Sequence, residues 1–342
     1  MHVADDPAAA SGSVPLHAPV LRIITVSRAQ VDGSIYDEMS RIRDSALRHN
    51  VPDGVATALL HQSGWFVQWK EGPRDTLRRL ISRIADDRRH HDLCVVHSSY
   101  GPRQLAGPWS MAIVQCADTI DEMGARVEHL RRDFARGRQY APAAVWRRLS
   151  TPMHHPVAVQ RAGTETFQRV LVCAARGTAS FALVEWLGRA YRAEVVHRRF
   201  AGASDLDVAS DYVDFIDDQR VLRVIAMARR GLTVPLTRAF LPDYSHILLL
   251  LSGEHEADLQ LVDRLIDGCK SLAAPPHLLG MARDPACHVP VLSRARAAGL
   301  TYLPIDGSAD GRADSWMAVR PHLDRWREGS NSLWPEAPVG LE

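Results

Sequence analysis

Three groups of residues could by type take part in acid–base, metal or thiol chemistry. His154 and His155 are adjacent, but no third ligand stands at metal-motif spacing, so the sequence predicts no metal site. Asp217 and Asp218 lie in a polar turn, which accounts for two neighbouring carboxylates without a bound metal. The cysteines are odd in number and at least 18 positions apart, which indicates reduced thiols rather than a disulfide framework or a zinc site. These cysteines are Cys94, Cys116, Cys173, Cys269 and Cys287.

The elements that must position functional side chains alternate, in residues 20–137, between strand-like and helix-like patterns. Short apolar runs bounded by turn signals predict five strands. Apolar residues at helical spacing predict helices over Ser34–His49 and Pro73–Asp87. The order strand, helix, strand, strand, helix, strand, strand indicates a ferredoxin-like α+β sandwich whose two helices cover one face of the sheet.

A third helix is predicted from Asp118, as its cap, to Gly137. Its apolar residues follow a 3,4,3,4 spacing, which is the seam of a coiled coil, but two heptads are too few for one. Packing of this helix on the exposed face of its own sheet is the favoured interpretation. We expect it to be the output element of the first domain.

The rest of the chain predicts a linker and a second domain. Residues 138–166 are rich in Pro, Arg, His and small residues without a sustained period, which is typical of a linker. Residues 167–328 predict an α/β domain with an edge strand near Val195–Arg198, an antiparallel hairpin, and strands alternating with helices. The very apolar strand His246–Ser252 indicates a mainly parallel sheet buried on both faces. Residues 1–19 are expected to be a flexible leader and residues 329–342 a tail.

Composition excludes several classes of protein. Hydrophobic residues make up 46% and charged residues 24%, which excludes a disordered or supercharged chain. The net charge is +1, so no nucleic-acid partner and no anionic membrane surface is expected. Among 41 basic residues only Lys70 and Lys270 are lysines. Apolar runs such as Ile247–Leu251 are far shorter than the ~20 residues of a membrane span, and cytoplasmic localisation is expected.

Five sequence blocks in the first half are specific as an ordered set. They are TVSRA at Thr25–Ala29, HN at His49–Asn50, DGVATALLHQSGWFVQWKEG at Asp53–Gly72, DDRRH at Asp86–His90 and WSM at Trp109–Met111. Through them the stretch from Val20 to Ala135 resembles the BLUF family of flavin-binding blue-light sensors. The resemblance implies an FAD cofactor that lies edge-on between the two helices, with aliphatic walls and amide groups at its polar edge.

The cofactor-binding positions that the resemblance implies are Ile42, Asn50, Gln68, Arg89 and His90. The amide of Gln68 has a donor end and an acceptor end. Its rotation or tautomerisation would turn a change in the flavin into a rearranged hydrogen-bond network. The guanidinium of Arg89 suits an electron-rich carbonyl edge or a phosphate of the cofactor.

The positions implied for the light response are Thr25, Gln68, Trp109 and Met111. Trp109 and Met111 match residues of the fifth strand that pass the signal on. The family places a tyrosine at the position of Thr25, and its phenol gives an electron and then a proton to the excited flavin. A threonine hydroxyl has no oxidisable π system, so we expect the usual photocycle to be absent. Ala56 and Thr57 replace a usual Thr-Gly, and the added side chain is expected to narrow and weaken the pocket.

The second half resembles Ras-like small GTPases through its order of elements, in particular the bacterial kind that works with roadblock-type partners. Its loop AARGTASF keeps Gly177 but has Ser180 and Phe181 where a P-loop has Lys and Ser/Thr. The segment Met281–Asp284 keeps only the aspartate of the base-reading Asn-Lys-x-Asp. The sequence thus predicts a degenerate GTPase-like domain without nucleotide hydrolysis, and an unrelated α/β domain with flavodoxin-like winding is the alternative.

These predictions indicate a non-enzymatic regulatory protein. A BLUF-like module would be joined to a pseudo-GTPase domain, and output would go through contact with a protein partner of the roadblock or GTPase-pathway type. A homodimer is a further expected assembly. One alternative is a blue-light receptor that uses another electron donor, such as Trp109. Another is a flavin-regulated enzyme with its activity in the second domain, although the sequence has no cyclase or phosphodiesterase metal-carboxylate signature.

Overall fold

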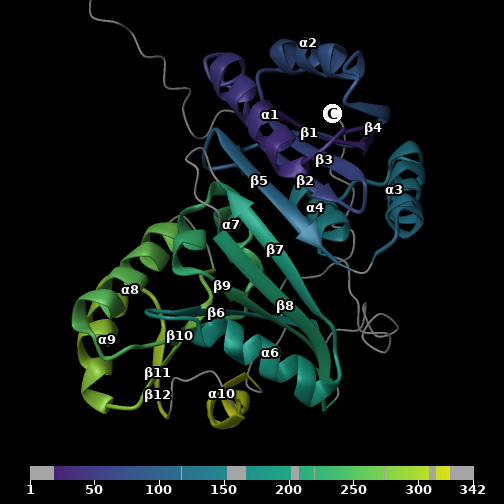
Figure 1. Cartoon of the computed structure of the whole chain (residues 1–342). Coiled ribbons are helices and arrows are strands. Elements are labelled where there is room, and N and C mark those ends of the chain that lie inside the picture. The colour runs from purple at the N-terminus through teal and green to yellow at the C-terminus, as the bar shows by residue number, and fades with distance from the viewer. Residues whose placement is uncertain are drawn as a thin grey trace, which may run out of the picture.

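The computed structural model describes residues 19–116, 118–151, 167–201, 208–218, 220–270, 272, 274–307 and 313–323. The first seven elements are β1 (Val20–Ala29), α1 (Ile35–His49), β2 (Ala56–Gln62), β3 (Trp65–Gly72), α2 (Arg74–Ala85), β4 (His90–Gly101) and β5 (Trp109–Gln115). The strands pair in the order β4-β1-β3-β2-β5, and α1 and α2 lie on one face of this sheet (Figure 1). The predicted ferredoxin-like sandwich is confirmed.

Local sequence explains how these elements begin and turn. Ser34 caps α1, because its hydroxyl accepts a hydrogen bond from the backbone N–H of Asp37 at 3.3 Å. The two-residue turn between β2 and β3 has Ser63 at φ +48° and Gly64 at φ +75°. Positive φ at both positions matches the twist of a tight hairpin, so β3 pairs directly with β2. Its other side pairs with β1, which makes β3 the central strand of this part of the sheet.

Two further helices, α3 (Ile120–Ala135) and α4 (Pro142–Ser150), pack against the opposite face of this sheet. α3 buries Met123, Val127 and Leu130 there, so packing on its own sheet is confirmed. The prediction that Asp118 caps this helix is wrong: Thr119 is the cap and forms a capping box with Glu122.

The helix α4 lies in the segment that the sequence predicts to be a linker, and this part of the prediction is wrong. The helix has only nine residues, too few to show a period, yet it buries Trp146 and Leu149. The Trp146 ring lies 6.1 Å from the ring of Trp69, centroid to centroid. Burial of this apolar face, and not local propensity, stabilises the helix. Residues 152–166, with His154 and His155, lie outside the described residues.

The remaining elements follow the predicted order, apart from the short helix α7, which the sequence did not predict. They are β6 (Phe167–Ala174), α6 (Ala179–Tyr191), β7 (Val195–Ala201), β8 (Val208–Asp217), β9 (Arg220–Met227), α7 (Pro235–Ala239), β10 (His246–Leu250), α8 (His255–Cys269), β11 (His277–Ala282), α9 (His288–Ala297), β12 (Tyr302–Asp306) and α10 (Ala313–Leu323). The predicted hairpin is present, since β8 and β9 are antiparallel neighbours. β6, β9, β10, β11 and β12 run parallel, whereas β7 and β8 make the sheet mixed rather than mainly parallel throughout.

The prediction that the strand near Val195 is an edge strand is wrong. β7 pairs with β8 on one side and antiparallel with β5 on the other. The result is one twelve-stranded sheet in the order β12-β11-β10-β6-β9-β8-β7-β5-β2-β3-β1-β4, which runs through both halves of the molecule (Figure 1). Pairing covers the exposed backbone groups of two strands that would otherwise be open edges.

No helix in the described part of the chain is long and apolar enough to cross a bilayer.

Candidate functional site

A cavity of about 320 Å³ lies between α1 and α2, over the central strand β3. Its volume falls within the range of small-molecule sites, roughly 300–1,000 Å³. All five predicted cofactor positions line it, namely Ile42, Asn50, Gln68, Arg89 and His90. Trp109 lines it as well, whereas Thr25 and Met111 do not. Both of these are buried beside it in the sheet.

The strand and helix periods explain why these residues meet. Side chains alternate along β3, so that Phe66, Gln68 and Lys70 all face the helices and line the cavity. The last turns of α1 place Ile42 and Ala46 one turn apart on the opposite wall. The site is therefore built from rigid elements, with amide and apolar groups facing each other.

Lys70 also lines the cavity, and the sequence did not predict it there. Its side chain is only 3% exposed, and its ammonium donates a hydrogen bond to Oε1 of Gln68. Burial lowers the pKa of Lys70 to about 7. One sequence signal could have found it, because Lys70 occupies an inward-facing position of an otherwise buried strand. The lysine fixes which end of the Gln68 amide remains free for a ligand.

Several buried polar atoms beside the cavity have no hydrogen-bond partner among the described residues. They are Oγ1 of Thr25, Nδ1 of His90 and Nε1 of Trp109. Thr25 is fully buried and stands opposite Gln68 in the β1–β3 pairing, so both side chains face the helices. Unsatisfied buried polar groups are costly, and a ligand with a polar edge would satisfy them. The residues present thus fit a flavin ring.

Two carboxylates hold the guanidinium of Arg89 at the mouth of the cavity. Its Nε donates to Asp87 Oδ1 at 2.9 Å, and its Nη1 donates to Glu38 Oε1 at 3.2 Å. The hydrogen bonds from Arg89 lower the pKa of Asp87, so this carboxylate stays charged. A phosphate at Arg89 would have to compete with both carboxylates. Burial lowers the pKa of the adjacent His90, which keeps its ring neutral at neutral pH.

The structure brings together one group of three possible metal ligands within its described ranges. Glu185, His197 and Asp211 have ligand atoms within 4.8 Å of one another. His197 Nδ1 lies 3.0 Å from Asp211 Oδ2, so these two side chains already pair with each other. The sequence analysis did not find this group, because its members come from α6, β7 and β8.

The loop after β6, which the sequence compares with a P-loop, contains one glycine in the left-handed conformation. Gly177 adopts φ +64°, the left-handed conformation that favours glycine. Ser180 is buried in the first turn of α6, and the exposed Arg176 pairs with Glu254 at 2.5 Å. Asp284 accepts a hydrogen bond from the backbone N–H of Ala286 at 2.9 Å, so its carboxylate caps a short helix.

Comparison with known proteins assigns the first domain. Residues 20–112 match the BLUF family model, "Sensors of blue-light using FAD". A photoactivated adenylate cyclase subunit beta from Euglena gracilis is 31% identical over 116 residues, which cover 33% of this chain. The corresponding subunit from Euglena longa is 29% identical over 116 residues, again 33% of this chain. In each case the chain spans about 14% of the length of the curated relative.

Solved structures match over similar or larger parts of the chain. The dark state of the BLUF protein BlrB is 21% identical, with a TM-score of 0.25, and the match covers 34% of this chain and 84% of that one. A manganese and cyclic-di-GMP complex of BlrP1 from Klebsiella pneumoniae is 16% identical, with a TM-score of 0.25, over 87% of this chain and 78% of that one. With the family match and the cavity between α1 and α2, residues 20–112 form an N-terminal BLUF domain.

Proposed function

We propose that the chain is a regulatory protein whose BLUF domain binds FAD in the cavity between α1 and α2 but lacks the usual photocycle. The observation that carries this proposal is a cavity lined by all five predicted cofactor positions, with Thr25 buried opposite Gln68 in place of a tyrosine. FAD, when bound, supplies a blue-light chromophore and a redox centre. Asn50 and Gln68 would hydrogen-bond its polar edge, and Ile42 would contact its apolar face.

The strand β5 is the route by which this domain would act on the rest of the chain. Trp109 lines the cofactor cavity, and Met111 is buried on the same face of β5. Across the β5–β7 ladder, Met111 stands opposite Ala201 and Val114 stands opposite Arg198. A shift of β5 would therefore move β7 directly, because backbone hydrogen bonds join the two strands. This is a physical connection within one sheet, and it needs no flexible linker.

The second domain, in this proposal, is a pseudo-GTPase that contacts a protein partner. Its order of elements and the left-handed Gly177 after β6 support the GTPase-like part. The buried Ser180 at the lysine position, and the use of Asp284 as a helix cap, support the loss of nucleotide binding. Cytoplasmic localisation and a partner of the roadblock type complete the proposal, and both rest on the sequence alone.

FAD uptake tests the first part of the proposal. We expect the purified chain to bind added FAD, and its absorption spectrum to stay unchanged under blue light. Asn50→Ala should weaken binding about fivefold, because one amide hydrogen bond contributes about 1 kcal/mol. Arg79→Ala, a change at an arginine of α2 that does not line the cavity, serves as the control. A protein that stays colourless with excess FAD would contradict the proposal.

The same spectra examine a second candidate function. Trp109 lines the cavity and its Nε1 has no partner in the described part of the chain, so it is placed to act as a different electron donor. A light-induced spectral change in the wild type that disappears in Trp109→Phe would favour a working photoreceptor with this donor over a silent one.

Nucleotide binding tests the second domain. We expect no binding of GTP or GDP, with or without Mg²⁺, when the nucleotide is titrated calorimetrically into the protein to a large molar excess. The loop has no lysine to contact the terminal phosphates, and Phe181 stands where the magnesium-binding hydroxyl would be. Saturable GTP binding at one site per chain would refute the pseudo-GTPase assignment while leaving the FAD proposal untouched.

A further inference from the structure

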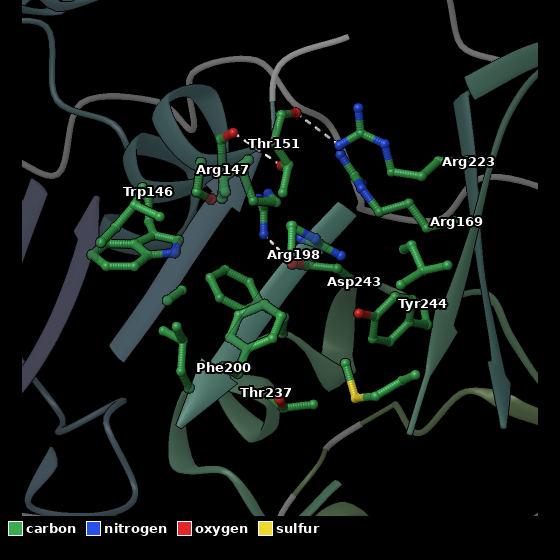
Figure 2. Close-up of a pocket in the computed structure, with 18 residues that line it drawn as sticks. Trp146, Arg147, Thr151, Arg169, Arg198, Phe200, Arg223, Thr237, Asp243 and Tyr244 are labelled. Carbon is green, nitrogen blue, oxygen red and sulfur yellow. Dashed lines mark hydrogen bonds and ion pairs between the residues drawn. The ribbon is translucent and has the colours of Figure 1, made fainter. Parts of the chain in front are cut away.

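A second cavity, of about 50 Å³, lies on the face of β5 that is turned away from the FAD site. Figure 2 shows the residues that line it. Ala112 and Val114 line it, whereas Trp109 on the other face lines the FAD cavity. Strand alternation thus puts two cavities on opposite faces of one strand. Four arginine side chains come together at this second cavity: Arg147 of α4, Arg169 of β6, Arg198 of β7 and Arg223 of β9. We call it the arginine cavity.

Carboxylates pair with two of these four arginines, Arg147 and Arg223. Asp243 is the acidic side chain that lines the cavity, and it pairs with Arg147. Asp214 accepts two hydrogen bonds from Arg223, at 2.6 and 2.7 Å. Arg198 is different, because it forms no ion pair with a carboxylate in the part of the chain that the structure describes. Asp211 also lies on β8, but its side chain faces the other side of the sheet from Asp214 and pairs with His197.

The arginine cavity also contains buried N–H groups without acceptors. Nε of Arg147 and Nε of Arg198 have no hydrogen-bond partner in the described ranges. Arg198 is 8% exposed, and its Nη2 donates a hydrogen bond to Ser210 Oγ at 3.1 Å. Its guanidinium lies over the ring of Tyr212, 4.8 Å from the centroid. Burial lowers the pKa of Arg198. Buried charge that lacks a counterion is costly, so an anion is the missing component.

We propose that the arginine cavity binds one small tetrahedral oxyanion, of which inorganic phosphate is the simplest. One water molecule needs roughly 10–15 Å³ of cavity volume. This cavity therefore accommodates about four atoms of that size, which is the number of oxygens in phosphate. Guanidinium forks match oxyanion geometry with paired N–H donors. The arginine end of the cavity is polar, while Phe200 and Thr237 lie toward the other end (Figure 2). The small volume excludes a nucleoside.

This site is independent of FAD and goes beyond the proposed function. A bound oxyanion would tie α4, β7 and β9 together at the point where the BLUF domain joins the rest of the sheet. Anion binding would thereby fix the position of β7 against β5. Phosphate would act as a structural or regulatory ligand of the junction between the two halves.

Phosphate binding to the full-length chain without FAD tests the inference. We expect phosphate, but not chloride at equal ionic strength, to raise Tm by a few degrees at about 100 times its Kd. Equilibrium dialysis with radiolabelled phosphate should give one ion bound per chain. Arg198→Met should raise Tm in phosphate-free buffer, because it removes a buried charge without a counterion, and should abolish the phosphate effect. Arg294→Met, which removes an exposed arginine paired with Asp263, is the matched control.

Three results would overturn the inference. They are no bound phosphate in dialysis of the wild type, an equal rise in Tm with chloride, and a phosphate effect that Arg198→Met leaves intact. Dialysis of the wild type decides the matter even if the Arg198 variant does not fold. FAD uptake is measured separately, so failure of one proposal does not affect the other.

Discussion

Lys70→Met is expected to stabilise the folded protein at pH 7 and below, and to lose most of this advantage by pH 10. Lys70 is buried, and burial lowers its pKa from 10.5 to about 7. Between these two values the unfolded chain binds a proton that the folded chain does not bind, so wild-type stability rises with pH across this range. A shift of this size corresponds to at most about 5 kcal/mol. The methionine removes this cost, so its advantage is largest at low pH.

Urea unfolding of both proteins at several pH values between about 6 and 10 measures this effect, since the free-energy difference should fall by about 1.4 kcal/mol per pH unit above pH 7. The chain offers a matched control in its only other lysine. Lys270 is exposed and pairs with Asp267, so Lys270→Met should produce a small difference. A stabilisation by Lys70→Met that is the same at every pH would show that packing, and not the buried charge, is responsible.

The BLUF domain could be predicted from the sequence because its site is a local pattern carried by regular elements. Asn50 directly follows a helix with clear amphipathic spacing, and Gln68 lies on a strand between turn signals. The strand and helix periods then fix which way each side chain faces. The family resemblance assigns both Thr25 and Gln68 to the light response. The β1–β3 register places these two residues opposite each other. The structure adds one contact that the sequence did not predict, the hydrogen bond from Lys70 to Gln68.

The junction between the halves could not be predicted, because it depends on contacts between distant segments. The sequence near Val195 does not predict that β7 will pair with β5, because the backbone hydrogen bonds between strands do not depend on side-chain identity. The arginine cavity has the same origin. Arg147 and Arg223 are 76 positions apart, and the sequence does not distinguish them from the other arginines of the chain. They meet only because the fold brings α4, β6, β7 and β9 together. The domain boundaries remain predictions, because one continuous sheet crosses them.

Thr25→Tyr is expected to give the FAD-loaded protein a reversible shift of its flavin absorption to longer wavelength under blue light, which the wild type lacks. Position 25 is fully buried and faces Gln68 across the sheet, so the new phenol would lie beside the amide whose hydrogen bonds must change. Thr25→Phe adds nearly the same volume without an oxidisable hydroxyl. Each variant should lose about 1–3 kcal/mol of stability through overpacking. Only the tyrosine should respond to light.

Lys70 decides how large this response can be. Its ammonium donates to Oε1 of Gln68, so rotation of the amide in Thr25→Tyr must break a buried, charge-assisted hydrogen bond. We therefore expect the double variant Thr25→Tyr/Lys70→Met to give a larger and longer-lived shift than Thr25→Tyr alone. An equal shift in both would show that the lysine does not restrain Gln68. Absence of a shift in both, with FAD bound, would show that the pocket lacks more than its electron donor, because the amide would then be free and the phenol present.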